Sequence, residues 1–185
     1  MNILEIFTNS ILLIITLDNE LWDIILLSLF VSFTALIIAS LLGFIVGYYF
    51  AIYNFYFKKI ILIIINSLMG IPPVVVGLIV YFIFASGGPL GILQLLYTPS
   101  AMIIAQTIII FPIIASLSHE IFSKNWFEFK DQIRSLNIPF WGSVKLLFNH
   151  SYFLLITTLL SAFGRAISEV GAVMIVGGNI DHYTR

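Results

Sequence analysis

The sequence contains no cysteine and very little charge. The missing cysteine excludes a disulfide scaffold and a cysteine-ligated metal site. Only 9% of the 185 residues are charged, whereas soluble domains carry about 25%. The net charge of −1 gives no indication of nucleic-acid binding. With 61% hydrophobic residues, a chain of this length has more apolar surface than a soluble fold can bury. The composition therefore predicts an integral membrane protein surrounded by lipid.

The motifs of nucleotide-binding proteins and of common hydrolases are missing too. There is no G-x-x-x-x-G-K phosphate loop, so the chain does not bind ATP by that route. His119 and Glu120 begin an H-E-x-x-H zinc motif, but residue 123 is a serine and the motif fails. No serine–histidine–acid set or close carboxylate pair is suggested by the spacing. A membrane-embedded enzyme therefore has no positive support, and we expect no metal or cofactor in this chain.

Four apolar stretches approach the roughly 20 residues that cross a bilayer. They run over residues 24–50, 60–85, 100–117 and 152–176. Backbone groups in lipid must be satisfied within the protein, which favours helices, and the alternating pattern of a membrane barrel is absent. We expect an all-α, polytopic transmembrane bundle. The shorter apolar segment 3–17 is expected to lie along the membrane interface, with a tilted crossing as the alternative.

The basic residues predict the orientation of the chain. Lysines follow the first span, and the segment 118–150 holds seven of the seventeen charged residues (eight basic and nine acidic in the chain). The charged residues before the first span are all acidic. The positive-inside rule then places the N-terminus outside and the segments 53–59 and 118–150 in the cytoplasm. Segment 118–150 is expected to be a loop, either merely solvated or a docking surface for a cytoplasmic partner.

Two of the spans are interrupted by proline. The second contains Gly70-Ile71-Pro72-Pro73, followed by Gly77, and the third contains Pro112. Because proline removes a backbone donor and clashes with the preceding turn, we expect helix breaks or kinks at Pro72, Pro73, Gly77 and Pro112. Such breaks persist where the freed backbone groups face protein or a water-filled cavity. The alternative is a packing kink with no role in transport.

The first span carries glycines at positions 43 and 47. This spacing matches the small-xxx-small motif of closely packed membrane helices, although apolar helices also contain it by chance.

The last span contains two charges, Arg165 and Glu169, four residues apart and therefore on one face of the expected helix. Arg165 lies about 20 Å along the helix from Tyr152. A lone charge at the bilayer centre costs about 2.5–3.5 kcal/mol, which pairing partly offsets. In one interpretation the pair is an internal staple that fixes helix packing. In the other it lines a solute pathway, where Arg165 attracts an anion and also neutralises Glu169.

Two segments resemble a known family. GRAISEVGAVMIVGGNI (164–180) and MGIPPVVVGLIVYFIFASGGPLG (69–91) are similar to the matching segments in permease subunits of prokaryotic ABC importers for oxyanions, above all the tungstate-type branch. The segments occur in the family's order, and with the spans between them the resemblance covers essentially the whole chain. It implies a type I ABC importer permease fold over residues 1–185, a single transmembrane domain. Such permeases continue with a further span, so we expect this chain to lack a final helix.

The resemblance also implies partners. A second permease copy would complete the path in the prokaryotic plasma (inner) membrane, a separate ATPase subunit would hold ATP and Mg, and an extracytoplasmic binding protein would deliver tungstate, molybdate or another tetrahedral oxyanion. The family's cytoplasmic signature, E-A-A-x-x-x-G, matches DQIRSLNIP (131–139) with its two alanines replaced. Asp131 takes the glutamate place and Asn137 the glycine place, so Asp131, Arg134 and Asn137 are the candidates for the coupling helix. A stand-alone channel or secondary transporter for small anions is the alternative function.

Overall fold

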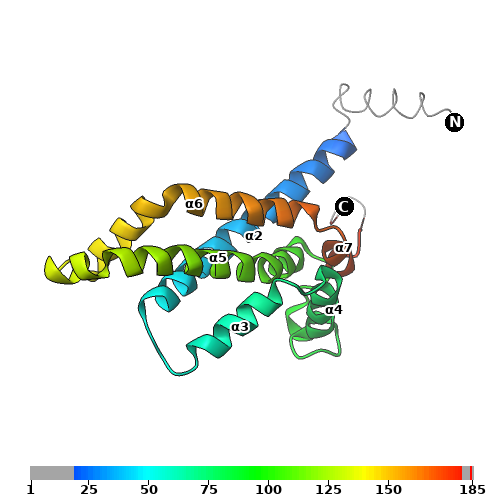
Figure 1. Ribbon diagram of the computed structural model, residues 1–185. Coiled ribbons are helices and arrows are strands. Elements are labelled where there is room, and N and C mark those ends of the chain that lie inside the picture. The colour runs from blue at the N-terminus through cyan, green and yellow to red at the C-terminus, as the bar shows by residue number, and fades with distance from the viewer. Residues whose placement is uncertain (1–18, 181–183, 185) are drawn as a thin grey trace.

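The computed structural model describes residues 19–180 and 184, and all the regular elements in this part are helices. Figure 1 shows their arrangement. In chain order they are α2 (Asn19–Ile52), α3 (Lys58–Leu68), α4 (Pro73–Phe84), the short 3-10 helix η1 (Gly91–Leu93), α5 (Pro99–Ser135), α6 (Phe140–Ser168) and α7 (Gly171–Gly177). The expected all-α transmembrane bundle is confirmed. The expected interfacial segment 3–17 lies outside the described residues.

Helix α5 is the centre of the bundle and contacts all five of the other described α-helices. Its most extensive partner is α2, which crosses it in Figure 1. Small side chains make this close approach possible, because alanines of the surrounding helices meet isoleucines of α5. The fully buried members of this cluster are Ala35 and Ala39 of α2, Ala162 and Ala166 of α6, Ala172 of α7, and Ile110 and Ile114 of α5.

The glycines of the small-xxx-small motif lie in the α2–α5 contact. A Cβ added at Gly43 would lie 2.8 Å from Cγ2 of Ile114, and one at Gly47 would lie 2.9 Å from the backbone nitrogen of His119. The hydroxyl of Ser118 also donates a hydrogen bond to the Gly43 carbonyl oxygen at 3.2 Å. The packing role that the motif predicts is confirmed.

The direction of α2 relative to α5 determines how the chain crosses the membrane. Gly43 lies against Ile114, and one turn further on Tyr48 lies edge-to-face with Phe122 at 5.6 Å between ring centroids. Residue numbers at the contacts increase along both helices together, so the chain runs in the same direction in α2 and in α5. The chain between them must therefore return across the membrane once. Helices α3 and α4, which meet at 103°, are together long and apolar enough to make that crossing as one broken span. With α2, α5 and α6 they give up to four crossings, in agreement with the four expected spans.

The predicted break at the proline pair is confirmed. Helix α3 ends at Leu68, Pro72 is the extended N-cap of α4, and Pro73 occupies the first helical position, where no backbone donor is needed. The two halves have different partners. The hydroxyl of Ser116 on α5 donates to Oδ1 of Asn66 on α3 at 2.5 Å, whereas α4 packs mainly against α7.

No helix break occurs at Pro112 or at Gly77, whereas a kink at Pro112 stays a prediction. Helix α5 continues through Pro112, which is buried, because packing on several sides outweighs one lost backbone hydrogen bond. Gly77 lies inside α4, where its missing side chain lets α4 approach α7. A Cβ there would lie 2.9 Å from the Cα of Ala172.

The expectation that residues 118–150 form a loop is also wrong. Helix α5 continues to Ser135 and α6 begins at Phe140, so only residues 136–139 are non-helical. The polar stretch of α5 has no proline or glycine, and its lysine, arginine and glutamate residues are good helix formers. A cluster of Phe122, Leu147 and Tyr48 also buries one face of it. The last span, expected as one helix over residues 152–176, is divided into two helices in the structure. Helix α6 ends at Ser168, and the short α7 follows.

Candidate functional site

The end of α6 carries the two charged residues of the last span. Arg165 lies in the last turn, and Glu169 is the C-cap, with φ −88° and ψ 96°. Nε of Arg165 lies 3.0 Å from Oε1 of Glu169. The predicted ion pair is therefore present, but the two residues do not share one helix. The pair instead bridges the last turn of α6 and the break that precedes α7.

The pair is less enclosed than the sequence suggests. The side chain of Arg165 is 39% exposed and that of Glu169 is 13% exposed. A staple between packed helices has to connect two elements, whereas this pair joins the last turn of α6 to its own cap. The Arg165 head group reaches the surface of the chain, a location that suits contact with a solute or a second subunit.

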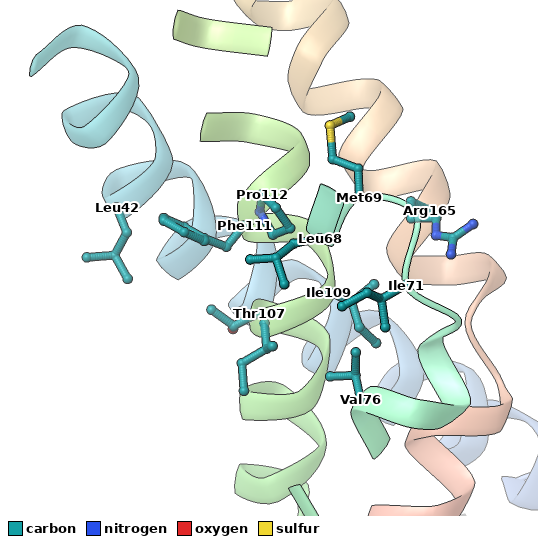
Figure 2. A pocket seen from close by; sticks show the side chains of 11 residues that line it. Leu42, Leu68, Met69, Ile71, Val76, Thr107, Ile109, Phe111, Pro112 and Arg165 are labelled. Carbon is teal, nitrogen blue, oxygen red and sulfur yellow. The ribbon is translucent and has the colours of Figure 1, made fainter. Parts of the chain in front are cut away.

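A hollow of about 300 Å³ lies beside Arg165, between the α3–α4 break, α5 and α6. Figure 2 shows the Arg165 side chain at its edge, with the guanidinium pointing away from the apolar side chains. The hollow is thus apolar, and Arg165 contributes its aliphatic stem to the wall. Its lining includes Leu68, Met69, Ile71, Val76, Pro112 and Arg165. The structure brings together the proline break and Arg165, two features that the sequence identified separately.

A second hollow, of about 400 Å³, lies on the Glu169 side of the pair, between α2, α5 and α7. Its polar lining includes Ser28, Ser32, Gln106, Asn179 and Glu169. Sequence reasoning missed Gln106 and the two serines. The available signal was a glutamine within an apolar span and two serines four residues apart on one helix face. The ion pair therefore lies between two hollows, with one partner lining each.

The end of α5 and the turn that follows it carry the residues that match the family signature. Asp131 and Arg134 are exposed, and Asn137 has a left-handed backbone with φ 48°. The N–H of Ile138 donates to the carbonyl of Ile133, and that of Asn137 to Arg134, which is a Schellman motif. This motif favours glycine at the left-handed position and tolerates asparagine. The conformation explains how Asn137 can occupy the glycine place of the signature.

Large apolar side chains surround this turn, although the segment is rich in charge. The exposed fractions are 74% for Phe127, 71% for Leu136 and 78% for Trp141. Phe127, Asp131 and Arg134 are spaced by four and three residues, so they share one face of α5. Sequence reasoning missed the apolar members because it followed only charge and the signature. We call Phe127, Asp131, Arg134, Leu136 and Trp141 the hairpin tip.

No cluster of metal-ligating side chains occurs in the described part of the chain. His119, from the failed zinc motif, pairs instead with the hydroxyl of Ser123 at 3.1 Å.

Comparison with known sequences gives several clear relatives, although no sequence-family profile matches the chain. The chain is 39% identical over 183 residues to the tungstate uptake system permease protein TupB of Peptoclostridium acidaminophilum, which covers 99% of this chain and 80% of that protein. It is 38% identical over 153 residues to a probable anion ABC transporter permease protein of Haloferax volcanii, over 83% of this chain and 66% of that one. The TupB protein of Campylobacter jejuni is 38% identical over 134 residues, which is 72% of this chain and 56% of the relative.

Proposed function

The chain belongs to the family of ABC transporter permeases that includes the tungstate uptake permeases, and from this membership we propose that it is the membrane subunit through which tungstate, or a related tetrahedral oxyanion such as molybdate, enters the cell. Two named tungstate permeases and one named anion permease among the relatives support the proposal. Those names favour a subunit of an ATP-driven importer over a stand-alone channel or secondary transporter. The chain itself is a multi-pass membrane protein with a role in transport.

The observation that carries the pathway assignment is the ion pair of Arg165 and Glu169 at the α6–α7 break. A charge is expensive at membrane depth, and it usually faces an aqueous path or a bundle interior. The Arg165 guanidinium presents five N–H donors, and the ion pair engages only its Nε. Its exposure at the surface of one chain suits a path completed by a second permease copy. In this proposal Arg165 attracts the dianion while it also offsets the charge of Glu169.

ATP-dependent uptake of labelled tungstate tests the proposed function. We expect proteoliposomes with two permease copies, the ATPase subunit and the loaded binding protein to accumulate tungstate only when ATP and Mg are present. Omission of the permease, or a non-hydrolysable ATP analogue, serves as the control. Uptake by the permease alone, driven by an anion gradient without ATP, would instead support the channel or secondary transporter. Competition by molybdate in the same assay measures selectivity.

The hairpin tip is the proposed docking surface for the ATPase. It combines exposed apolar and charged side chains from the last turns of α5, the connecting turn and the first turn of α6, and it carries the degenerate family signature. Basic residues nearby, including Lys124, Lys130 and Lys145, favour a cytoplasmic location for it. The expected arrangement is thus an N-terminus outside a prokaryotic inner membrane and the tip inside.

Replacing Asp131 and Arg134 together with alanine is expected to weaken ATPase binding without affecting membrane insertion. Each exposed charge contributes about 0–1 kcal/mol, so the double change removes up to about 2 kcal/mol and should lower affinity by up to about thirtyfold. Binding of the purified ATPase to inside-out vesicles measures this, and right-side-out vesicles should not bind it. The matched control is Glu120→Ala with Lys124→Ala, an exposed acid–base pair on the same helix, further from the turn. Equal affinity for both double variants would count against the tip as docking surface.

A further inference from the structure

Three buried polar side chains of α5 connect it to neighbouring helices. The hydroxyl of Ser118 donates to the carbonyl of Gly43 on α2, and Nδ2 of Asn125 donates to Oγ of Ser151 on α6 at 2.5 Å. The third is Gln106, whose side chain is only 4% exposed. Its Nε2 donates to a backbone carbonyl near the end of α6 at 3.2 Å. Of these three connections, this one lies at the candidate site.

The acceptor of the Gln106 hydrogen bond is the carbonyl oxygen of Ala166, which lies between the two charged residues. The same oxygen accepts the backbone N–H of Glu169 at 3.3 Å. The last carbonyls of a helix lack the partners that a further turn would provide, so donors from elsewhere must satisfy them. Gln106 provides such a donor from α5. One hydrogen bond therefore ties the backbone between Arg165 and Glu169 to the central helix.

The other end of the Gln106 amide is less favourable. Its Oε1 is buried and has no hydrogen-bond donor among the described residues. Burial of an unpaired acceptor costs free energy that an apolar side chain would not incur. Reversing the amide would turn Oε1 towards the Ala166 oxygen and lose the donor. The benefit of a glutamine at this position is thus the bond from Nε2 to Ala166.

We propose that Gln106 is a positioning residue of the transport pathway: by holding the Ala166 carbonyl, it fixes the α6–α7 break and sets the Arg165–Glu169 pair in the geometry that meets the oxyanion. The inference rests on the proposed pathway function of that pair. Gln106 itself need not touch the anion. Its neighbours in the second hollow, Ser32 and Glu169, place it on the pathway side of α5 and not in a distant part of the core.

The test compares Gln106→Leu with Asn125→Leu, since each removes a buried amide that connects α5 to α6. Both changes are expected to lower the amount of folded permease to a similar degree. Uptake per folded molecule in the complete assembly is expected to fall at least tenfold for Gln106→Leu and less than twofold for Asn125→Leu. In the background of Arg165→Leu with Glu169→Leu, Gln106→Leu should cause no further loss, because it acts through that pair.

Gln106→Glu supplies a readout that a purely structural role would not change. The glutamate has the shape of glutamine, but when ionised it has no donor for the Ala166 carbonyl. Protonation restores an O–H donor, so its uptake per folded molecule, relative to the native chain at the same pH, should rise as the pH falls. This variant also decides the question if the leucine variant does not fold.

Three results would overturn the inference: equal normalised uptake by the two single leucine variants, an additive loss in the charge-free background, or a flat pH ratio for Gln106→Glu. Failure of the proposed function is distinguishable, because it appears as normal uptake when Arg165 and Glu169 alone are replaced. Loss of uptake on that replacement, with no effect of the Gln106 changes, would overturn the positioning role only.

Discussion

The variant with both Arg165→Leu and Glu169→Leu is expected to insert and fold, yet to take up tungstate at a rate lower by a factor of about ten or more. A tenfold loss corresponds to about 1.4 kcal/mol. Replacement of a buried ion pair by apolar residues of similar volume is often neutral for stability, and this pair is only partly buried. The pair connects α6 only to its own cap, so no contact between helices depends on it. What disappears is the positive potential that attracts an anion at membrane depth.

The single change Arg165→Leu separates the electrostatic role from the structural one. It leaves Glu169, which is only 13% exposed, without its partner. Loss of one partner of a fully buried pair costs about 3–5 kcal/mol, and the partial exposure of Arg165 should reduce this. We therefore expect less folded permease from the single variant than from the double variant. Arg165→Lys, which keeps the charge, should retain more uptake than either.

Labelled uptake by the complete assembly, normalised to folded permease in the membrane, is the measurement. A matched control removes the exposed pair Glu120 and Lys124, which has the same spacing on α5. Near-normal uptake by the double-leucine variant would show that the two charges are dispensable, and the pathway role of Arg165 would have to be dropped.

The parts of the fold that the sequence predicted depend on strong local signals. Long apolar runs indicated the crossings, and the Pro72–Pro73 pair indicated a break because two consecutive residues lack backbone donors. The spacing of Arg165 and Glu169 indicated an ion pair, since residues four apart meet on a helix. The segments 69–91 and 164–180 carried the family resemblance. Each of these signals acts within a few residues or is read directly from the sequence.

The features that the sequence did not predict depend on tertiary packing. Pro112 looks like a break, but α5 contacts helices on several sides and continues. The charged stretch after Leu117 looks like a loop, but Phe122 packs against Tyr48 and Leu147 and keeps it helical. The partner of Gln106 is sixty residues away, at Ala166. No local pattern identifies such a partner.

Gly77 and Gly164 allow a second prediction, because the same substitution should have opposite effects at the two positions. Both glycines lie inside helices, where alanine is more favourable than glycine by about 0.8–1.0 kcal/mol. A Cβ added at Gly164 on α6 would meet no atom within 4 Å. Gly164→Ala is therefore expected to stabilise the permease by up to about 1 kcal/mol.

At Gly77 the added methyl group would collide with the backbone of α7. It would lie 2.9 Å from the Cα of Ala172 and 3.1 Å from its carbonyl oxygen. Backbone atoms cannot move aside like the end of a flexible side chain, so α4 and α7 would have to separate. Overpacking of this kind costs about 1–3 kcal/mol, more than the gain in helix propensity. Gly77→Ala should destabilise the permease, and Gly77→Leu should prevent it from accumulating in folded form.

The midpoint of thermal unfolding in detergent, measured for the native chain and both alanine variants, tests this prediction. Helix α7 begins two residues after Glu169, so displacement of α7 should also disturb the ion pair and lower uptake per folded molecule. Ala172→Gly, introduced together with Gly77→Ala, removes one of the colliding groups, the Cβ at 3.2 Å. It should recover part of the lost stability, because the Cα and the carbonyl oxygen remain. If Gly77→Ala were as stable as Gly164→Ala, the close approach of α4 to α7 would not exist in the folded protein.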